Sequence, residues 1–178
     1  MTIRNFFCII VTMFLFTACN QAQQAQKTSD KSEEVSMPLK TADGQTIEKV
    51  IKTPEEWKAE LTAEEYNILR EAGTERSFTS DLLSNKKEGV YVCAGCQFPL
   101  FSSDTKFKSG TGWPSFYQPI NDYCIAEKKD NKYGWNRVEV LCARCGGHQG
   151  HIFEDGPEPT GLRYCINGVA LDFEEKKD

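Results

Sequence analysis

The pattern of apolar and polar positions divides the chain into an apolar leader, a polar segment and one region of mixed character. Residues 6–16 are largely apolar, and residues 20–50 are rich in Gln, Lys, Ser, Thr and Glu and contain no aromatic residue. Such a polar segment cannot bury enough apolar surface to offset the entropy cost of ordering it. We therefore expect a flexible tether over residues 19–52. One domain is expected over residues 53–178, a common domain size.

Two short helices are predicted at the start of this domain. Thr53-Pro54-Glu55-Glu56 and Thr62-Ala63-Glu64-Glu65 each place a threonine three residues before a glutamate, which is the capping-box pattern. The proline suits the first turn of a helix. Apolar residues follow at helical spacing in both segments, so one face of each helix is expected to pack on a core. Gly73 fits the position that follows the second helix.

From residue 89 onward the pattern is typical of short strands. β-branched and aromatic residues are enriched, and residues 137–141 alternate between polar and apolar. Glycine and proline mark loops at residues 110–114 and 156–161. The expected strands cover residues 90–92, 98–101, 137–141 and 162–173. The predicted fold class is therefore α+β, mainly antiparallel β, with the helices on the N-terminal side.

The leader has the pattern of an export signal. Residues 1–5 carry one positive charge, and the apolar run after them is shorter than the roughly 20 residues that a membrane-spanning helix needs. The run ends at Phe16-Thr17-Ala18-Cys19, which resembles the lipobox of bacterial lipoproteins. That resemblance implies a signal peptide over residues 1–18, a lipid on Cys19 and anchoring to a membrane of the bacterial cell envelope. The alternative is ordinary cleavage near Ala18 without a lipid.

The cysteines fall into two classes. Cys93 and Cys96 form one Cys-x-x-Cys knuckle, and Cys142 and Cys145 form another. Two knuckles supply four thiolates, which is enough for one structural zinc ion with no open position. A rubredoxin-like iron site for electron transfer would use the same ligand set. Outside the leader and the lipobox, Cys124 and Cys165 are left over.

The remaining candidates for chemistry are two histidines and one cysteine. His148 and His151 are the only histidines in the chain. Because four thiolates already complete a tetrahedron, the histidines are better placed as proton donors or substrate-binding groups. Cys165 is the candidate nucleophile, and Arg163, two residues earlier on the same face of a strand, is expected to lower its pKa. By spacing alone, a buried inert cysteine is an equal alternative.

Five stretches of the chain resemble the methionine-R-sulfoxide reductase B family, over about residues 57–173. They are Gly73–Phe78, the first knuckle with Pro99–Phe101, Ser109–Phe116, the second knuckle with His148–Pro157, and Pro159–Asn167. The resemblance implies two antiparallel sheets clamped by a four-cysteine zinc site. It also implies reduction of the R-epimer of methionine sulfoxide, free or within proteins.

The same resemblance implies roles for individual residues. Cys165 would attack the sulfoxide sulfur and become a sulfenic acid. His148, His151 and Asn167 would orient or protonate the sulfoxide, with Asp155 and Arg163 supporting them. Trp113 would pack against the methyl group of the substrate, and Phe153 would also belong to the substrate site.

One position departs from the family pattern. Many members carry a recycling cysteine between the two glycines before the tryptophan, where this chain has Thr111. Either Cys124, in a polar and mobile loop, forms a disulfide with Cys165, or a reductant attacks the sulfenic acid directly. The expected partners are oxidised proteins or peptides and a thioredoxin-like reductant.

Two further expectations concern association. A net charge of −5 without a Lys/Arg cluster disfavours nucleic acid, and a monomer is expected. The main rival function, from another class, is a non-catalytic zinc-ribbon interaction module.

Overall fold

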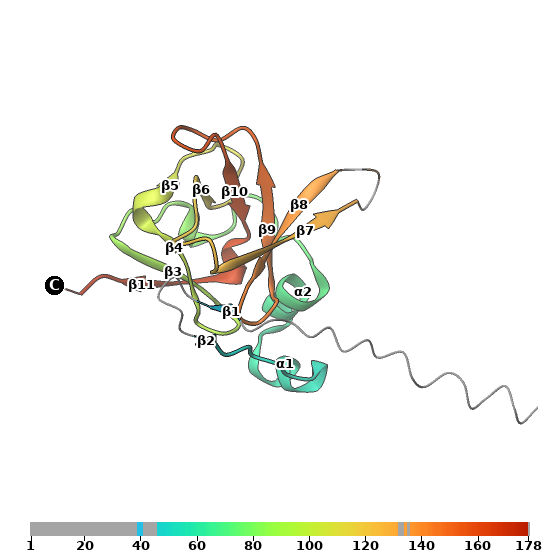
Figure 1. Cartoon of the computed structure of the whole chain (residues 1–178). Helices are drawn as coiled ribbons and strands as arrows, with labels where there is room; N and C mark the ends of the chain where they lie inside the picture. Colours follow the sequence, from blue (N-terminus) through green and yellow to red (C-terminus); the bar gives the residue numbers. More distant parts are fainter. Residues whose placement is uncertain (1–38, 41–45, 132–133, 135, 178) are drawn as a thin grey trace, which may run out of the picture. The chain divides into compact units, whose positions relative to one another are not determined.

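The computed structural model describes residues 39–40, 46–131, 134 and 136–177 (Figure 1). The predicted signal peptide, Cys19 and most of the predicted tether lie outside these residues. Within the described part of the chain, none of the helices is long and apolar enough to cross a membrane. The folded part begins before residue 53, because Lys49 Nζ donates to the carbonyl of Ala143 at 2.6 Å and Val50 N–H donates to that of Arg144 at 3.0 Å.

Both predicted helices are present with the predicted caps. α1 spans Pro54–Glu60 and α2 spans Ala63–Glu71, and each has a complete capping box. The end of α2 differs from the prediction, because the left-handed residue is Ala72, with φ of 55°. Gly73 leaves space for the Asn67 side chain instead, which a Cβ at this position would displace.

Most of the strands form two antiparallel sheets (Figure 1). The larger sheet has the order β5-β6-β10-β9-β8-β7 and the smaller one the order β11-β3-β4, while β1 (Leu39–Lys40) and β2 (Thr46–Ile47) form a separate pair. The bounds in the larger sheet are β5 Lys106–Phe107, β6 Ser115–Phe116, β7 Ile125–Asp130, β8 Arg137–Cys142, β9 His148–Phe153 and β10 Arg163–Ile166. Those in the smaller sheet are β3 Gly89–Cys93, β4 Pro99–Ser102 and β11 Leu171–Glu175. The predicted class, α+β and mainly antiparallel, is confirmed.

Three features of this sheet order were not expected. The polar segment after Cys124 is strand β7, and the histidine-containing segment is strand β9. The single strand predicted over residues 162–173 is divided into β10 and β11 by a 3₁₀ turn at Gly168–Ala170, and the two halves belong to different sheets.

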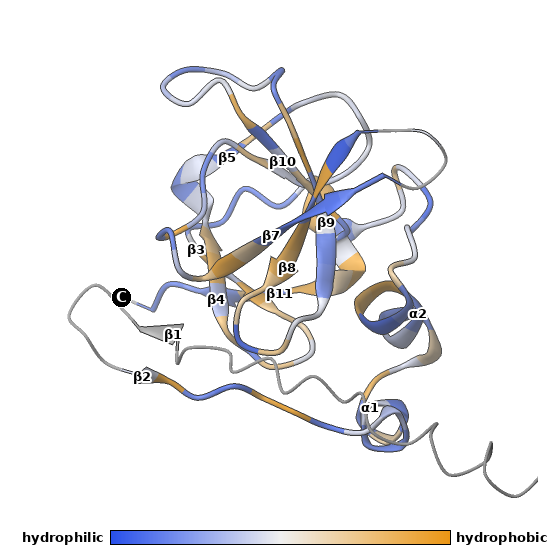
Figure 2. Ribbon diagram, turned by 45° about the vertical axis from the view of Figure 1, so that its right-hand side comes forward, coloured by the Kyte–Doolittle hydropathy of each residue, from blue (hydrophilic) through white to orange (hydrophobic). Residues whose placement is uncertain are grey.

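An aromatic core joins the two sheets. Phe101 of β4 stacks on Phe116 of β6 with ring centroids 4.4 Å apart, and Tyr91 of β3 meets the same ring edge-on at 5.0 Å. Tyr164 of β10 completes the cluster. Apolar colour accordingly concentrates on β3, β4 and β8 in Figure 2, whereas β7 and much of α2 are polar. Because side chains alternate along a strand, the neighbours of Phe116 and Tyr164, Ser115 and Cys165, point to the opposite face.

Candidate active site and metal centre

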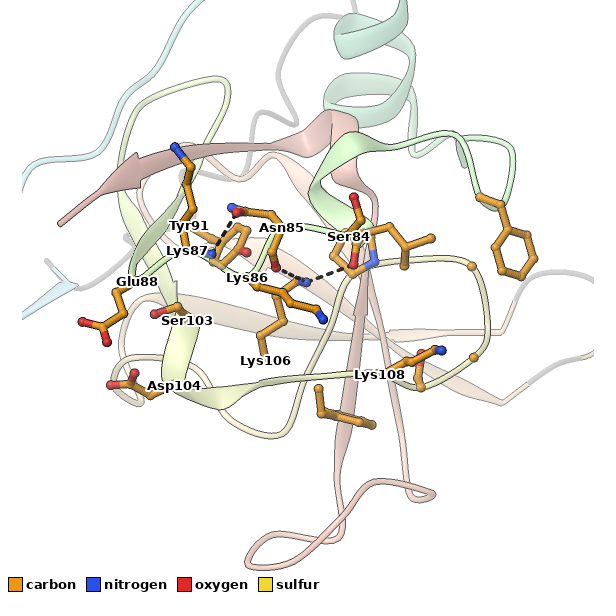
Figure 3. Close-up of a pocket in the computed structure, with 17 residues that line it drawn as sticks. Ser84, Asn85, Lys86, Lys87, Glu88, Tyr91, Ser103, Asp104, Lys106 and Lys108 are labelled. Atoms are coloured by element: carbon orange, nitrogen blue, oxygen red, sulfur yellow. Dashed lines mark hydrogen bonds between the residues drawn. The ribbon is translucent and has the colours of Figure 1, made fainter.

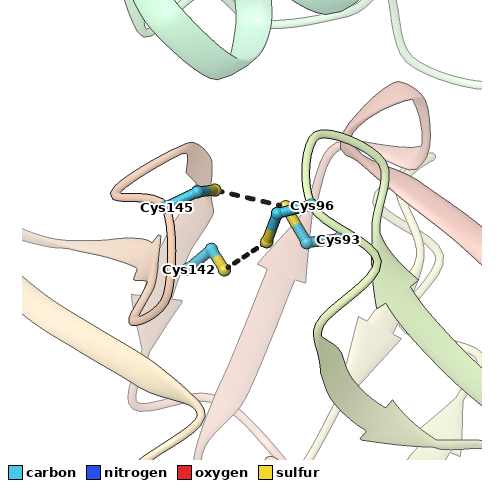
Figure 4. Close-up of side chains that lie close together, drawn as sticks. All are labelled: Cys93, Cys96, Cys142 and Cys145. Atoms are coloured by element: carbon cyan, nitrogen blue, oxygen red, sulfur yellow. Dashed lines mark hydrogen bonds between the residues drawn. The ribbon is translucent and has the colours of Figure 1, made fainter. Parts of the chain in front are cut away.

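The four knuckle cysteines come together at one end of the two sheets (Figure 4). Cys93 ends β3 and Cys142 ends β8, and the two knuckles bring all four sulfurs within 4.8 Å of one another. The Sγ–Sγ distances are 3.7 Å for Cys93–Cys145 and 3.5 Å for Cys96–Cys142. A tetrahedron with metal–sulfur distances of about 2.3 Å has sulfurs about 3.8 Å apart. This group can therefore hold a metal ion that ties the smaller sheet to the larger one.

The two knuckles share a backbone conformation. The residue after the second cysteine is left-handed in both, with φ of 57° at Gln97 and 70° at Gly146. Its N–H donates to the carbonyl of the first cysteine, at 2.7 Å in one knuckle and 2.8 Å in the other. This turn brings the two sulfurs of each knuckle to the same side of the chain.

The candidate active site lies on the face of the larger sheet that points away from the aromatic core. Cys165 is paired with Ser115 in β6 and with His151 in β9, and His151 is paired with Glu139 in β8. Residues directly opposite each other share a face of the sheet. A hydroxyl, a thiol, an imidazole and a carboxylate therefore form one row across four strands.

An irregularity in β9 brings both histidines to this face. Val140 pairs with Gly150 while Leu141 pairs with His148, so β9 contains one extra residue between these pairs. In a regular strand, residues three apart point to opposite faces. Here the rings of His148 and His151 lie edge to face with centroids 5.4 Å apart.

Each histidine ring of β9 contacts a carboxylate from another strand, Glu139 from the neighbouring β8 and Asp130 from β7 at the sheet edge. His148 Nδ1 lies 2.8 Å from Glu139 Oε1, and His151 Nε2 lies 2.9 Å from Asp130 Oδ2. Arg137 donates to the same Asp130 oxygen at 2.7 Å. No local pattern marks these two carboxylates, because each lies within two residues of a lysine or an arginine, as in an ordinary solvated strand.

Burial dominates the electrostatics of Cys165. Desolvation raises the pKa of its thiol, while the charge of Arg163 and a contact with Thr111 Oγ1, 3.9 Å from the sulfur, lower it by less. Arg163 therefore lowers the pKa of Cys165 as expected, but burial raises it by more, and the net shift is upward. The resting thiol is mostly protonated near neutral pH.

Arg163 is held beside this row by two contacts. Its guanidinium donates to both carboxylate oxygens of Asp155, at 2.8 and 2.9 Å, and lies 4.4 Å from the ring centroid of Phe153. The hydrogen bonds from Arg163 lower the pKa of Asp155. Arg163 and Phe153 are paired two residues along the strands from Cys165 and His151, so the structure brings these four predicted residues to the same face.

A buried glutamate that the sequence did not single out connects Trp113 to Asn167. Glu75 is 5% exposed, and its carboxylate accepts hydrogen bonds from the N–H groups of Gly168 at 2.7 Å and Val169 at 2.8 Å. Its own N–H donates to Asn167 Oδ1 at 3.1 Å, and its carbonyl accepts from Trp113 Nε1 at 3.3 Å. Its only signal in the sequence is its place in one of the stretches that carry the family resemblance.

Gln149 connects the active site to the cysteine cluster. Its carbonyl accepts from the N–H of Asn167 at 2.8 Å and from Asn167 Nδ2 at 3.0 Å. Its side chain extends the other way, with Nε2 3.5 Å from Cys93 Sγ. A single residue of β9 therefore touches both centres.

Cys124 does not lie beside Cys165. It is fully buried in the aromatic core, and its single S–H is shared between the carbonyl oxygens of Leu100 and Asn121, which lie 3.3 and 3.2 Å from Sγ. Burial also raises the pKa of this thiol. The core surface that it shares with Tyr164 is on the opposite face of β10 from Cys165. The mobile loop expected around Cys124 is thus a buried strand end, and a disulfide with Cys165 would require the core to open.

Comparison with known proteins gives one consistent result. The SelR domain model matches residues 61–175. Proteins named peptide methionine sulfoxide reductase MsrB are similar over this region. The one from Leptospira interrogans is 57% identical over 127 residues (71% of this chain and 97% of that protein), and the one from Methanosarcina mazei is 56% identical over 130 residues (73% and 93%). The one from Pseudomonas putida is 54% identical over 130 residues (73% and 98%). The chain therefore belongs to the MsrB family, which the SelR domain defines.

Proposed function

We propose that this chain reduces methionine R-sulfoxide in peptides and proteins to methionine. The observation that carries the proposal is the position of Cys165 directly opposite His151, in a chain 57% identical to a protein named peptide methionine sulfoxide reductase MsrB. A thiol beside an imidazole is the arrangement that nucleophilic attack with proton donation requires.

The chemistry follows from the row across the sheet. The sulfur of Cys165 attacks the sulfoxide sulfur while His151 or His148 donates a proton to the sulfoxide oxygen. The attack forms a bond between the two sulfurs, and the thiol proton of Cys165 replaces the proton that the histidine donated. The oxygen then passes to Cys165: a sulfur–oxygen bond forms there, the sulfur–oxygen bond of the substrate and the sulfur–sulfur bond break, and methionine leaves while Cys165 is left as a sulfenic acid. The substrate sulfur gains two electrons and the Cys165 sulfur loses two. Asp130 and Glu139 orient the two rings through their contacts at 2.9 and 2.8 Å.

The surrounding residues position the substrate. Trp113 packs against the methyl group of the sulfoxide, and Phe153 forms another wall of the site. Asn167 orients the sulfoxide and holds the turn that follows Cys165. Asp155 holds the guanidinium of Arg163 in place, and the positive charge of Arg163 stabilises the thiolate when it forms.

A reductant is proposed to attack the Cys165 sulfenic acid directly. Thr111 occupies the position where many family members have a recycling cysteine, and its hydroxyl is 3.9 Å from the Cys165 sulfur. Cys124 is buried on the other face of the strand. A thioredoxin-like dithiol would form a mixed disulfide with Cys165 and resolve it with its second thiol.

Zinc is the proposed metal of the four-cysteine cluster. The sulfur spacing fits a closed tetrahedral thiolate site, which is typical of structural zinc. When bound, the ion joins the two knuckles and so supports β9, and it takes no part in the reduction. A colourless purified protein with one zinc per chain would separate this site from a thiolate iron site.

The chain is further proposed to be a lipoprotein of the cell envelope, anchored through Cys19. The support is the sequence pattern that ends at Phe16-Thr17-Ala18-Cys19. Incorporation of a labelled fatty acid by the wild-type chain and not by Cys19→Ser would support the anchor, whereas labelling of both proteins would contradict it.

The activity is tested with the purified chain, separated R- and S-epimers of methionine sulfoxide in a short peptide, and dithiothreitol. The R-epimer is expected to be reduced and the S-epimer left unchanged. Cys165→Ser should remove turnover without changing the circular dichroism spectrum, with Cys124→Ser as the matched thiol control. Turnover that survives in Cys165→Ser would refute the assignment.

A further inference from the structure

A pocket of about 730 Å³ lies beside the candidate active site, and the proposed reaction does not use it. Figure 3 shows Glu88 and Asp104 toward one end of this pocket and Lys108 toward the other, with Lys106 between them. Its lining includes apolar rings as well as four lysines, at positions 86, 87, 106 and 108.

The pocket is continuous with the loop that contacts Cys165. Ser109, Gly110 and Gly112 line it, and Thr111 between these glycines reaches the Cys165 sulfur. Phe107, also in the lining, is paired with Ser115, which is paired with Cys165. Phe107 and Cys165 are two strand spacings apart in the sheet, a distance of about 10 Å. An extended peptide covers that distance in about three residues.

The lysines near the catalytic loop lack acidic partners. Within the described part of the chain, no carboxylate lies at ion-pairing distance from Lys86, Lys106 or Lys108, whereas Lys87 pairs with Glu175. Lys106 is half-buried, and its ammonium group donates only to the carbonyls of Leu83 at 3.1 Å and Asn85 at 2.9 Å. Burial lowers the pKa of Lys106, because the charge is desolvated without a counter-charge. This cluster is positive in a chain whose net charge is −5.

The lining also contains a polar group that is not satisfied. Tyr91 is fully buried, and its hydroxyl has no partner with good hydrogen-bond geometry among the described residues, although the Asn85 side chain interacts with it. Burial raises the pKa of Tyr91 to about 12, against a smaller lowering by the Asn85 side chain, so the hydroxyl remains a donor. A buried hydroxyl without a well-placed acceptor is costly, and an acceptor supplied by an occupant of the pocket would satisfy it.

We propose that this pocket binds an acidic side chain of the oxidised substrate, about three residues from the methionine sulfoxide. A carboxylate there would be the counter-ion that Lys106, Lys86 and Lys108 lack. Phe78, 67% exposed at the rim, offers an apolar surface to the intervening residues. This inference rests on the proposed function, and it adds a preference among peptide substrates.

The test uses the purified full-length chain and peptides with one methionine sulfoxide and a single Glu, Gln or Lys three residues before or after it. The Glu peptide is expected to have a kcat/KM about three- to tenfold above that of the Lys peptide, because a partly desolvated charge pair forms. The difference should fall as salt is added. Free methionine sulfoxide should be reduced equally by all the proteins below.

Three variants distinguish an effect of the pocket lysines from an effect of the overall charge of the protein. Lys106→Met and the double variant Lys86→Met/Lys108→Met should each reduce the preference for Glu. The double variant changes only exposed side chains, so it remains informative if Lys106→Met folds poorly. Lys177→Met removes the same charge from an exposed position outside the pocket and should keep the preference.

The outcomes are distinct. Equal kcat/KM for all peptides, or a preference that survives in both pocket variants, overturns the inference and leaves the proposed function intact. A loss of preference in Lys177→Met as well would assign the effect to net charge and also overturn it. No reduction of free methionine sulfoxide or of any peptide would overturn the proposed function and this inference with it.

Discussion

Replacement of Glu75 is predicted to damage stability and activity together, although this side chain does not contact Cys165 in the structure. Its carboxylate accepts two backbone hydrogen bonds at the turn after β10, at 2.7 and 2.8 Å, in a position that is 5% exposed. Glu75→Ala would leave the N–H groups of Gly168 and Val169 buried without acceptors. Hydrogen bonds to a charged group contribute about 1.5–3 kcal/mol each.

The expected loss in the free energy of unfolding is therefore about 3–5 kcal/mol for Glu75→Ala. Glu75→Gln retains one acceptor oxygen and turns an N–H₂ group toward the second backbone donor. The expected loss in the free energy of unfolding for this variant is therefore about 2 kcal/mol. Both changes release the segment whose backbone groups bind Trp113 and Asn167. A displacement of about 1 Å at such groups costs about a hundredfold in rate.

Urea denaturation measures the stability, and kcat and KM for a methionine sulfoxide peptide measure the positioning. For Glu75→Gln, measured below its unfolding transition, kcat should fall at least tenfold. Glu71→Gln, an exposed change nearby, is the control and should alter neither quantity. A Glu75→Gln protein that loses stability but keeps wild-type kcat would show that Glu75 has no positioning role and would refute the reasoning.

Three further predictions concern other parts of the site. Cys142→Ser should release the metal and destabilise the domain, as measured by metal analysis together with thermal unfolding; full stability without metal would contradict a structural role. Asp130→Asn should lower kcat about tenfold or more while the metal content stays at the wild-type level, because the His151 ring loses its carboxylate partner; a parallel fall in metal would place the histidine in the metal site. The alkylation rate of Cys165 by iodoacetamide should rise with pH to a midpoint above the ordinary cysteine value, since burial raises its pKa and only the thiolate reacts; a midpoint below that value would mean that Arg163 outweighs burial.

The parts of the fold that depend on local chemistry could be predicted from the sequence. A threonine and a glutamate three residues apart satisfy each other within one turn, so both capping boxes appear where the pattern indicates. The two knuckles are local in the same sense, and the structure brings them together. Cys165, His151, Arg163 and Phe153 were all named from the sequence, although the row that they form depends on the pairing of β10 with β9.

The parts of the fold that depend on pairing between distant segments could not be predicted from the sequence. β7 contains Glu-Lys-Lys-Asp, a composition typical of a solvated loop. The segment is nevertheless a strand, because it pairs with β8, and its position at the sheet edge leaves the charged side chains in contact with solvent. That pairing also places Cys124 in the core. The extra residue in β9 could not be predicted from the sequence, because only the register of β9 against β8 defines it. Glu75 acts on groups more than 90 residues away, beyond the reach of any local pattern.

The contact of Gln149 with both the cysteine cluster and the active site has a consequence for how the protein is inactivated under oxidative stress. Four thiolates that hold a metal are themselves targets of the oxidants that produce methionine sulfoxide. Oxidation of Cys93 would release a metal bound there and add oxygen to the sulfur against which the Gln149 side chain rests, and Gln149 anchors Asn167 through its carbonyl. Damage to the cluster would thus reach the active site through one residue. The working lifetime of each molecule would then be set by the durability of its metal centre rather than by the number of turnovers at Cys165.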